Sequence, residues 1–216
     1  LRPDDIIISD IGGVLVWVFW PDANQSGRVV APGQPVSQTD SLIARLENAR
    51  ADKPRDVKTM IDLASAYLQK IRETADNSLY IKAEALMNEA KKFEPANLNI
   101  IAVQAAIAAG RHDFQKSFAL AKQLIQTSSS TARYWGLLGD AQIELGQYEA
   151  AIQSFQTMVD LRPDFSSFSR IAYVRELYGD IPGAIEAMQS ALVAGGSFAE
   201  NIAWAHSELG RLYLNS

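Results

Sequence analysis

The stretch YWGLLGDAQIELGQYEAAIQSFQTMVDLRPD, from Tyr134 to Asp164, places small and large residues in a definite order. The residues that carry this order are Trp135, Leu138, Gly139, Gly146, Tyr148, Ala151, Phe155 and Pro163. Helices pack as ridges into grooves, so a glycine or alanine beside large side chains lets two backbones approach closely. Helices commonly end at a glycine, and a proline cannot continue a helix. The order therefore predicts two packed helices, one ending near Gly146 and one before Pro163.

The same order recurs elsewhere in the chain. Ala172 stands in the position of Gly139, 33 residues further along, and Gly210 repeats it again after a short insertion. Upstream, Ala64 belongs to a weaker copy of the pattern. The segment that joins its two predicted helices is about seven residues longer than a repeat of about 34 residues allows. The copy between residues 97 and 130 is the least regular. A repeated helix pair is the simplest explanation of this periodicity.

The pattern resembles the tetratricopeptide repeat, a helix–turn–helix unit of about 34 residues. The resemblance covers roughly residues 41–216 and implies an all-α fold, a right-handed α-solenoid, because one unit cannot bury its apolar face without its neighbours. The expected divisions are an apolar segment at 1–20, a polar linker at 21–39 and a repeat domain at 40–216. Within that domain we expect a half-unit at 40–55, repeats at about 56–96, 97–130, 131–164 and 165–197, and a partial repeat at 198–216.

Core and turn roles are expected at the residues that define the repeat. These structural positions are Ala64, Ala83, Pro95, Trp135, Leu138, Gly139, Gly146, Tyr148, Ala151, Phe155, Pro163, Ala172, Gly179, Ala184 and Gly210. In the last, partial repeat the apolar side chains of Leu209, Leu212 and Leu214 are expected to lack a covering helix within this chain.

The resemblance also indicates where a partner would bind, because in this family the first helices of the pairs line an inner groove. The positions next to the packing stripe are Ile100, Gln104, Ile107, Arg133, Asp140, Ile143, Ser169, Tyr173, Glu176 and Arg211. Three isoleucines in such a groove favour an apolar or amphipathic segment. Family members that capture a terminal carboxylate use lysine, arginine and asparagine, whereas Ser65, Gln104 and Asp140 stand at those positions here.

The first forty residues have a different composition. Ile11–Trp20 is an unbroken apolar run of ten residues, whereas a spanning helix needs about twenty. The run suits a signal-peptide core, a buried strand or an anchor remnant, and Pro, Gly, Ser, Gln and Asn after it indicate a linker. We expect membrane contact through residues 6–20 and a bacterial cell-envelope location. A strand pair, a docked tail and a cytoplasmic location are the alternatives.

The composition and motifs exclude several kinds of site. The formal net charge is −5 and the pI about 5.1, so no nucleic-acid surface is expected. The absence of cysteine excludes disulfides, zinc–thiolate sites and cysteine nucleophiles. Neither His112 nor His206 has a carboxylate at metal-ligand spacing, and no glycine-rich phosphate loop occurs. The chain is therefore predicted to be non-catalytic and to have no cofactor or metal.

The sequence favours a protein–protein interaction scaffold that holds a peptide or a partner helix. One alternative is a structural assembly subunit that forms a homo-oligomer or joins a larger complex through its open last repeat. A narrower alternative comes from SLIARLENARADKPRDVKTMIDLASAYL, Ser41 to Leu68, which resembles the start of the repeats in cytochrome c maturation proteins. That resemblance implies a holdase for an unfolded apocytochrome.

Overall fold

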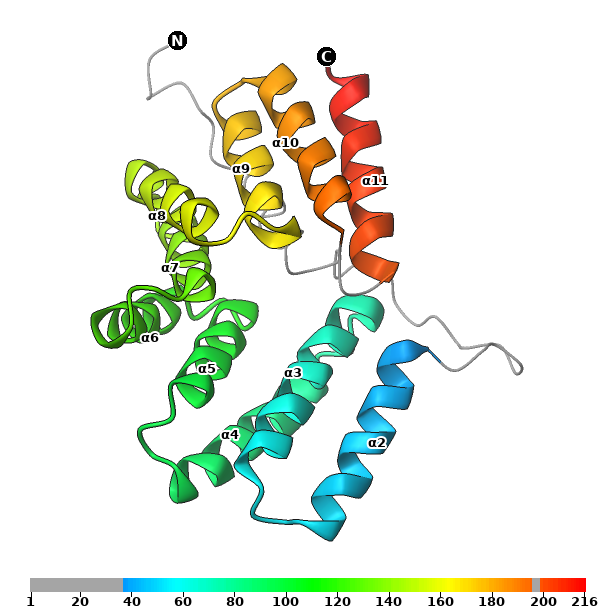
Figure 1. The fold of residues 1–216 in the computed structure, drawn as a ribbon, viewed down its shortest axis with the longest axis vertical. Helices are drawn as coiled ribbons and strands as arrows, with labels where there is room; N and C mark the ends of the chain where they lie inside the picture. The colour runs from blue at the N-terminus through cyan, green and yellow to red at the C-terminus, as the bar shows by residue number, and fades with distance from the viewer. Residues whose placement is uncertain (1–36, 196–198) are drawn as a thin grey trace. The chain divides into compact units, whose positions relative to one another are not determined.

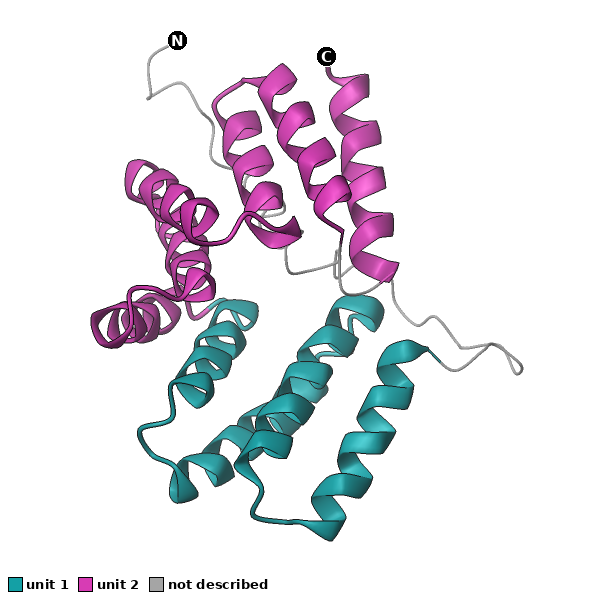
Figure 2. Ribbon diagram, in the orientation of Figure 1, with its two compact units in different colours: residues 1–112 teal, residues 113–216 magenta. Residues whose placement is uncertain are grey.

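The computed structural model describes residues 37–195 and 199–216, and within them the regular elements are all helices (Figure 1). They are α2 (Gln38–Asp52), α3 (Val57–Thr74), α4 (Leu79–Phe93), α5 (Leu98–Gly110), α6 (Phe114–Thr127), α7 (Ala132–Glu144), α8 (Tyr148–Leu161), α9 (Phe165–Leu177), α10 (Ile181–Ala194) and α11 (Ala199–Leu214). The chain divides into two units, residues 1–112 and 113–216 (Figure 2). The predicted all-α repeat fold is confirmed.

Unit 1 contains α2 to α5, with α3 packed against both α2 and α4, and α4 packed against α5. Its core includes Met60, Ile71 and Met87, all of which are fully buried. Helix α3 has 18 residues, whereas α5 has 13. The segment that is too long for the repeat is therefore accommodated largely by extending α3.

Unit 2 contains α6 to α11, and its closest helix pairs are α7 with α8 and α9 with α10. Helix α6 packs against α7, α8 against α9, and α10 against α11. Phe155 of α8 and Leu124 of α6 are fully buried. A further core cluster, which includes Ala172 and Met188, joins α9, α10 and α11. Each helix pair thus buries apolar surface against its neighbours, as a repeat protein requires.

Small residues stand at the helix crossings. A Cβ atom added at Gly139 would overlap the ring of Phe155, so α7 and α8 approach closely only because glycine is present. The alanines predicted to act in the same way are at most 1% exposed: Ala64, Ala83, Ala151, Ala172 and Ala184. Gly210 is different, because no atom lies within 4 Å of the place its Cβ would take. The expected crossing at Gly210 is wrong, since α10 packs against another side of α11.

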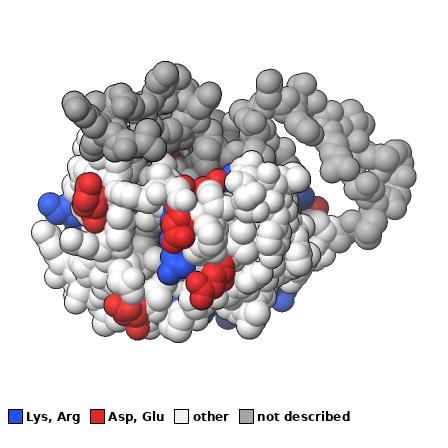
Figure 3. Space-filling model, turned by 90° about the horizontal axis from the view of Figure 1, so that it is seen from above, with Lys and Arg blue, Asp and Glu red and all other residues white. Residues whose placement is uncertain are grey.

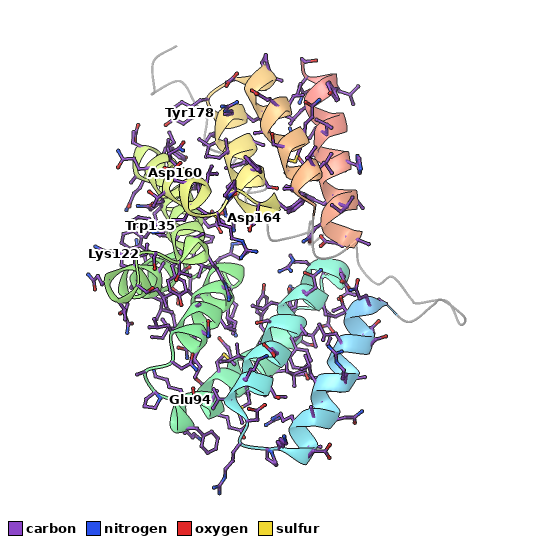
Figure 4. The ribbon with its side chains drawn as sticks, in the orientation of Figure 1. Glu94, Lys122, Trp135, Asp160, Asp164 and Tyr178 are labelled. Carbon is purple, nitrogen blue, oxygen red and sulfur yellow. The ribbon has the colours of Figure 1, made fainter. Side chains whose placement is uncertain are left out.

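Large residues fill the space beside these crossings. Phe155 is fully buried, Leu138 is 8% exposed, and the half-buried Trp135, labelled in Figure 4, donates from its indole Nε1 to a backbone carbonyl at 2.7 Å. Pro95 follows the end of α4, and Pro163 follows the end of α8. The structural roles expected of these five residues agree with their positions in the fold.

Aspartates mark the beginnings of four helices. Asp56, Asp113, Asp164 and Asp180 each accept a hydrogen bond from a backbone N–H in the first turn of the helix that follows. At Asp164, labelled in Figure 4, the carboxylate accepts from Ser167 N at 3.1 Å, and the Ser167 hydroxyl accepts from Asp164 N at 2.9 Å. This reciprocal capping box satisfies two backbone donors and fixes where α9 begins.

Left-handed residues mark the ends of the first helices. Gly146 and Gly179 have φ of 72° and 78° just after α7 and α9, which confirms their predicted role. In unit 1 the equivalent turns are made by Ala75, with φ of 56°, and His112, with φ of 61°. The sequence indicates a turn at His112, but it does not indicate the left-handed conformation of either residue, because residues with a Cβ atom rarely adopt it.

The expected apolar segment at residues 1–20 and most of the expected linker at 21–39 lie outside the described residues. Helix α2 begins at Gln38 with Ser37 as its cap, so the last two residues assigned to the linker are helical. Thr39 is fully buried. Within residues 37–195 and 199–216, none of the helices has the length and apolar character needed to cross a bilayer.

Candidate functional site

A buried ion pair joins α7 to α9. Arg170 of α9 donates from Nε and Nη2 to the two carboxylate oxygens of Asp140 in α7, at 2.8 and 2.7 Å. The side chains of Arg170 and Asp140 are only 5% and 12% exposed. Arg170 Nη1 also donates to the Ser166 carbonyl at 2.9 Å. Burial raises the pKa of the Asp140 carboxyl, and Arg170 opposes that rise. The bidentate geometry fixes the position of α9 beside α7.

A second ion pair joins α9 to α11. Arg211 of α11 donates from Nη2 to Glu176 in α9 at 2.6 Å, and from Nε to Glu208 one turn earlier in α11 at 2.9 Å. The hydrogen bonds to Glu176 are the main reason why the pKa of Arg211 is raised. Because this arginine side chain is 40% exposed, the pair lies at the surface. Within unit 2 the two ion pairs place the first helices of successive repeats, α7, α9 and α11, side by side. We call their shared face the α7–α9–α11 surface.

Tyr173 of α9 lies between Arg170 and Glu176 along the helix. It is 8% exposed, and its phenolic oxygen is buried without a hydrogen-bond partner among the described residues. Burial is the main cause that raises the pKa of Tyr173, and Glu144, the half-buried Tyr148 and Glu176 raise it further. The charges of two carboxylates therefore act on the phenolic oxygen, which donates to neither.

Glu144 is the last residue of α7 and is half-buried. Within the described part of the chain its side-chain carboxylate forms neither a hydrogen bond nor an ion pair. Burial, and then the nearby charge of Asp140, raise the pKa of Glu144 to about 7. The carboxylate also lies at the carboxyl end of its helix, where the helix dipole disfavours negative charge. Its surroundings therefore favour a positive charge beside it.

The residues predicted to line the groove are mostly buried. Six of the ten are buried: Ile100, Ile107, Asp140, Ile143, Ser169 and Tyr173. Gln104, Glu176 and Arg211 are half-buried, and Arg133 is exposed. The structure brings Asp140, Tyr173, Glu176 and Arg211 together on the α7–α9–α11 surface. Their role in binding a partner stays a prediction.

The expectation that isoleucines face an open groove is wrong. Ile100 and Ile107, 1% and 2% exposed, belong to the core of unit 1, and Ile143 in unit 2 is 3% exposed. The sequence of α5, LNIIAVQAAIAAG, has apolar residues on nearly every side. A helix with this composition has no distinct apolar stripe, so its periodicity does not show which side faces outward.

The sequence analysis missed three residues of this surface, namely Glu144, Arg170 and Glu208. Arg170 directly follows the predicted groove residue Ser169, and the repeat pattern assigns it no role. The spacing of opposite charges in the sequence could have identified these contacts. Asp140 and Arg170 are 30 residues apart, and Glu176 and Arg211 are 35 residues apart. Opposite charges separated by about one repeat length identify contacts between successive first helices.

Apolar and charged side chains also occur elsewhere on the surface. The exposed large hydrophobic residues of the described chain are Ile81, Phe93, Leu161, Tyr178, Val193, Tyr213 and Leu214. Leu214 is 88% exposed as expected, whereas Leu212 is 1% exposed and Leu209 packs on the core of unit 2, so the expectation of three uncovered leucines is wrong for two of them. Figure 3 shows acidic and basic groups interspersed on one face. Within the described stretches, no group of three or more His, Asp or Glu residues is placed to hold a metal ion.

The helix pairs and their small-residue crossings define an α-helical repeat protein. The family model described as tetratricopeptide repeat matches residues 132–165, which contain α7 and α8. This segment is a tetratricopeptide repeat, and the chain has the fold of tetratricopeptide repeat proteins. A comparison with curated proteins finds no match.

Solved structures show the same fold at low sequence identity. TTC0263, a thermophilic repeat protein of this type from Thermus thermophilus, has a TM-score of 0.67 at 16% identity, over 82% of this chain and 91% of that chain. A tetratricopeptide repeat protein from Parabacteroides merdae has a TM-score of 0.68 at 14% identity, over 82% and 65%. The Cut9–Hcn1 hetero-tetramer of APC/C gives 0.67 at 16% identity, over 82% and 34%.

Proposed function

We propose that the chain is a protein-binding scaffold that holds a peptide or a helix of another protein on the α7–α9–α11 surface. The observation that carries the proposal is the succession of first helices tied side to side by the Asp140–Arg170 and Glu176–Arg211 pairs. Between these pairs lie the half-buried carboxylate of Glu144 and the buried hydroxyl of Tyr173, neither of which has a partner in the described chain. Such groups can pair with a bound segment.

The ion pairs also suit binding energetically. Arg170 makes hydrogen bonds to Asp140 and Ser166, and Arg211 makes hydrogen bonds to Glu176 and Glu208, so both arginine side chains are already ordered. Association normally costs about 0.5–1.5 kcal/mol for each flexible side chain that becomes immobilised. A surface whose charged groups are already ordered avoids much of this cost. The similar Cut9–Hcn1 structure is itself a hetero-tetramer, which supports a scaffold role for this fold.

Site-specific photo-crosslinking in the full chain tests the proposal. A photoreactive residue is placed at Arg133 or Ser207, both exposed on the first helices α7 and α11, and at Gln153, exposed on the outer helix α8, as the matched control. We expect the first two positions to label a common partner and Gln153 to label little. Equal labelling at all three positions would reject this surface as the binding surface.

Self-association is a second candidate function, favoured by exposed apolar side chains at the carboxyl end of α11. Leu214 is 88% exposed and Tyr213 51%. If this face joins two copies, light scattering of the full chain will give the mass of a dimer, and Leu214→Glu will reduce it. A monomer mass at every concentration would exclude self-association through this face.

The cell-envelope location also remains a proposal, which rests on the apolar run Ile11–Trp20. A flotation assay with lipid vesicles compares the full chain with a variant in which residues 11–20 are replaced by glycine and serine. Contact through this run predicts that only the parent chain floats with the vesicles. Equal recovery of both in the soluble fraction would reject membrane contact.

A further inference from the structure

The charges of the α7–α9–α11 surface do not balance. Its carboxylates outnumber its guanidinium groups, with Asp140, Glu144, Glu176 and Glu208 against Arg133, Arg170 and Arg211, and Arg133 lies near the start of α7, at the other end of the helix from Glu144. Asp140 is neutralised by Arg170, and Arg211 bridges two glutamates with one positive charge. The carboxylate of Glu144 has no basic partner in the described chain.

Helix geometry places Glu144 near Tyr173. Helices α7 and α9 run in the same direction, because α8 lies between them and short turns reverse the chain on either side of it. The Asp140–Arg170 hydrogen bonds align the two helices at one level. One turn further along, α7 presents Glu144 and α9 presents Tyr173, since residues three or four apart share a helix face.

Tyr173 provides an observation that is independent of the carboxylates. Its side chain is more than nine-tenths buried and its hydroxyl has no partner among the described residues, although a buried hydroxyl normally forms a hydrogen bond. The phenolic oxygen lies close enough to Glu144 and Glu176 for both charges to affect its pKa. A donor brought between Glu144 and Tyr173 would satisfy the carboxylate and the hydroxyl oxygen together.

We propose that Glu144 and Tyr173 recognise a basic side chain, lysine or arginine, of a protein segment held on the α7–α9–α11 surface. The proposal rests on the proposed scaffold function and specifies the chemistry of the partner. The ammonium or guanidinium group donates to the Glu144 carboxylate and to the Tyr173 hydroxyl oxygen, which accepts. An acidic side chain would be repelled by Glu144 and Glu176, and a neutral one would leave the Glu144 charge uncompensated.

A peptide selection experiment on the full chain tests this directly. The probes are phage-displayed random nonapeptides and, for affinity, fluorescent synthetic peptides with Lys, Arg, Gln or Glu at the selected position. The variants are Glu144→Gln, Glu144→Lys and Tyr173→Phe. The matched control is Glu149→Gln, an exposed glutamate in the first turn of α8. Circular dichroism confirms that each variant keeps its helices.

We expect the parent chain and Glu149→Gln to enrich one lysine or arginine position. Glu144→Gln should weaken binding of those peptides about tenfold, which is the loss of one charge-assisted hydrogen bond. Tyr173→Phe should weaken it about threefold by removing a neutral acceptor. Glu144→Lys should shift the preference toward aspartate or glutamate.

The outcomes distinguish this proposal from the scaffold function on which it rests. Peptides enriched without a basic preference, whose binding changes when Arg211 is replaced by alanine but not when Glu144 is replaced, would retain the scaffold function and overturn the basic recognition. No enrichment of any peptide would contradict the scaffold function as well. A response to Mg²⁺ or spermidine that Glu144→Gln removes, without any peptide preference, would assign Glu144 to a small cation and also overturn the proposal.

Discussion

Unit 1 and unit 2 are built from the same kind of helix pair, but different residues hold their helices in place. In unit 2 the first helices α7 and α9 end at left-handed glycines, and a buried ion pair, Asp140–Arg170, joins the two helices. In unit 1 the equivalent turns are made by Ala75 and His112. The small residues buried at the crossings are common to both units. The comparison indicates that this packing determines the fold, whereas turns and ion pairs can vary.

The largest expected effect concerns the buried ion pair. Asp140→Ala leaves the buried Arg170 without its carboxylate and should destabilise the protein by about 3–5 kcal/mol. Glu84→Ala, which breaks a pair with Arg111 at the surface of unit 1, is the matched control and should cost less than about 1 kcal/mol. Urea unfolding followed by circular dichroism measures both. Equal losses would show that the pair in unit 2 is no more important than a surface pair.

The next effect concerns the helix crossings. Gly139→Leu forces a side chain into the ring of Phe155 and should cost about 1–3 kcal/mol. Gly210→Leu places the same side chain in open space and should not destabilise the protein, because replacing an exposed glycine within a helix stabilises it by up to about 1 kcal/mol. Thermal melts of the two variants make the comparison. A Gly139→Leu protein as stable as its parent would contradict a close approach of α7 and α8.

These two glycines also show how far the sequence determines the fold. The repeat order correctly predicts helix pairs and the buried role of Gly139, because size and spacing control how helices pack. It assigns the same role to Gly210, because the pattern does not show which neighbour will be present on that side. The candidate surface is harder to predict. Arg170 and Asp140 are paired across two helices of unit 2, and this pairing depends on how successive helix pairs stack.

A smaller, reciprocal effect is expected at the turns. Gly179→Ala introduces a Cβ atom at a left-handed residue in unit 2 and should destabilise the protein by about 1 kcal/mol. In unit 1 the change Ala75→Gly relieves the strain of the same conformation and should stabilise the protein by up to about 1 kcal/mol. The greater conformational entropy of the unfolded glycine variant offsets part of this gain. Thermal melts test both signs. A loss of stability in Ala75→Gly would show that the Ala75 side chain makes contacts worth more than the strain.

The smallest effect is a difference in pH dependence between the units. Burial raises the pKa of Glu144 in unit 2 from 4.5 to about 7, so its contribution to stability is complete below about pH 4.5 and is lost as the pH rises through 7. Hydrogen bonding to Lys70 lowers the pKa of Asp40 in unit 1 below 3.8, so its contribution is present above that pH and is lost at more acidic pH. We therefore expect the stability of the parent, relative to Glu144→Gln, to fall as the pH rises from 4.5 to 7. The stability of the parent relative to Asp40→Asn should fall only below pH 4.

Urea unfolding across this pH range measures both differences. If the Glu144 difference is flat, folding does not raise the pKa of this carboxylate, and its surroundings do not favour the positive charge that the basic-residue proposal requires.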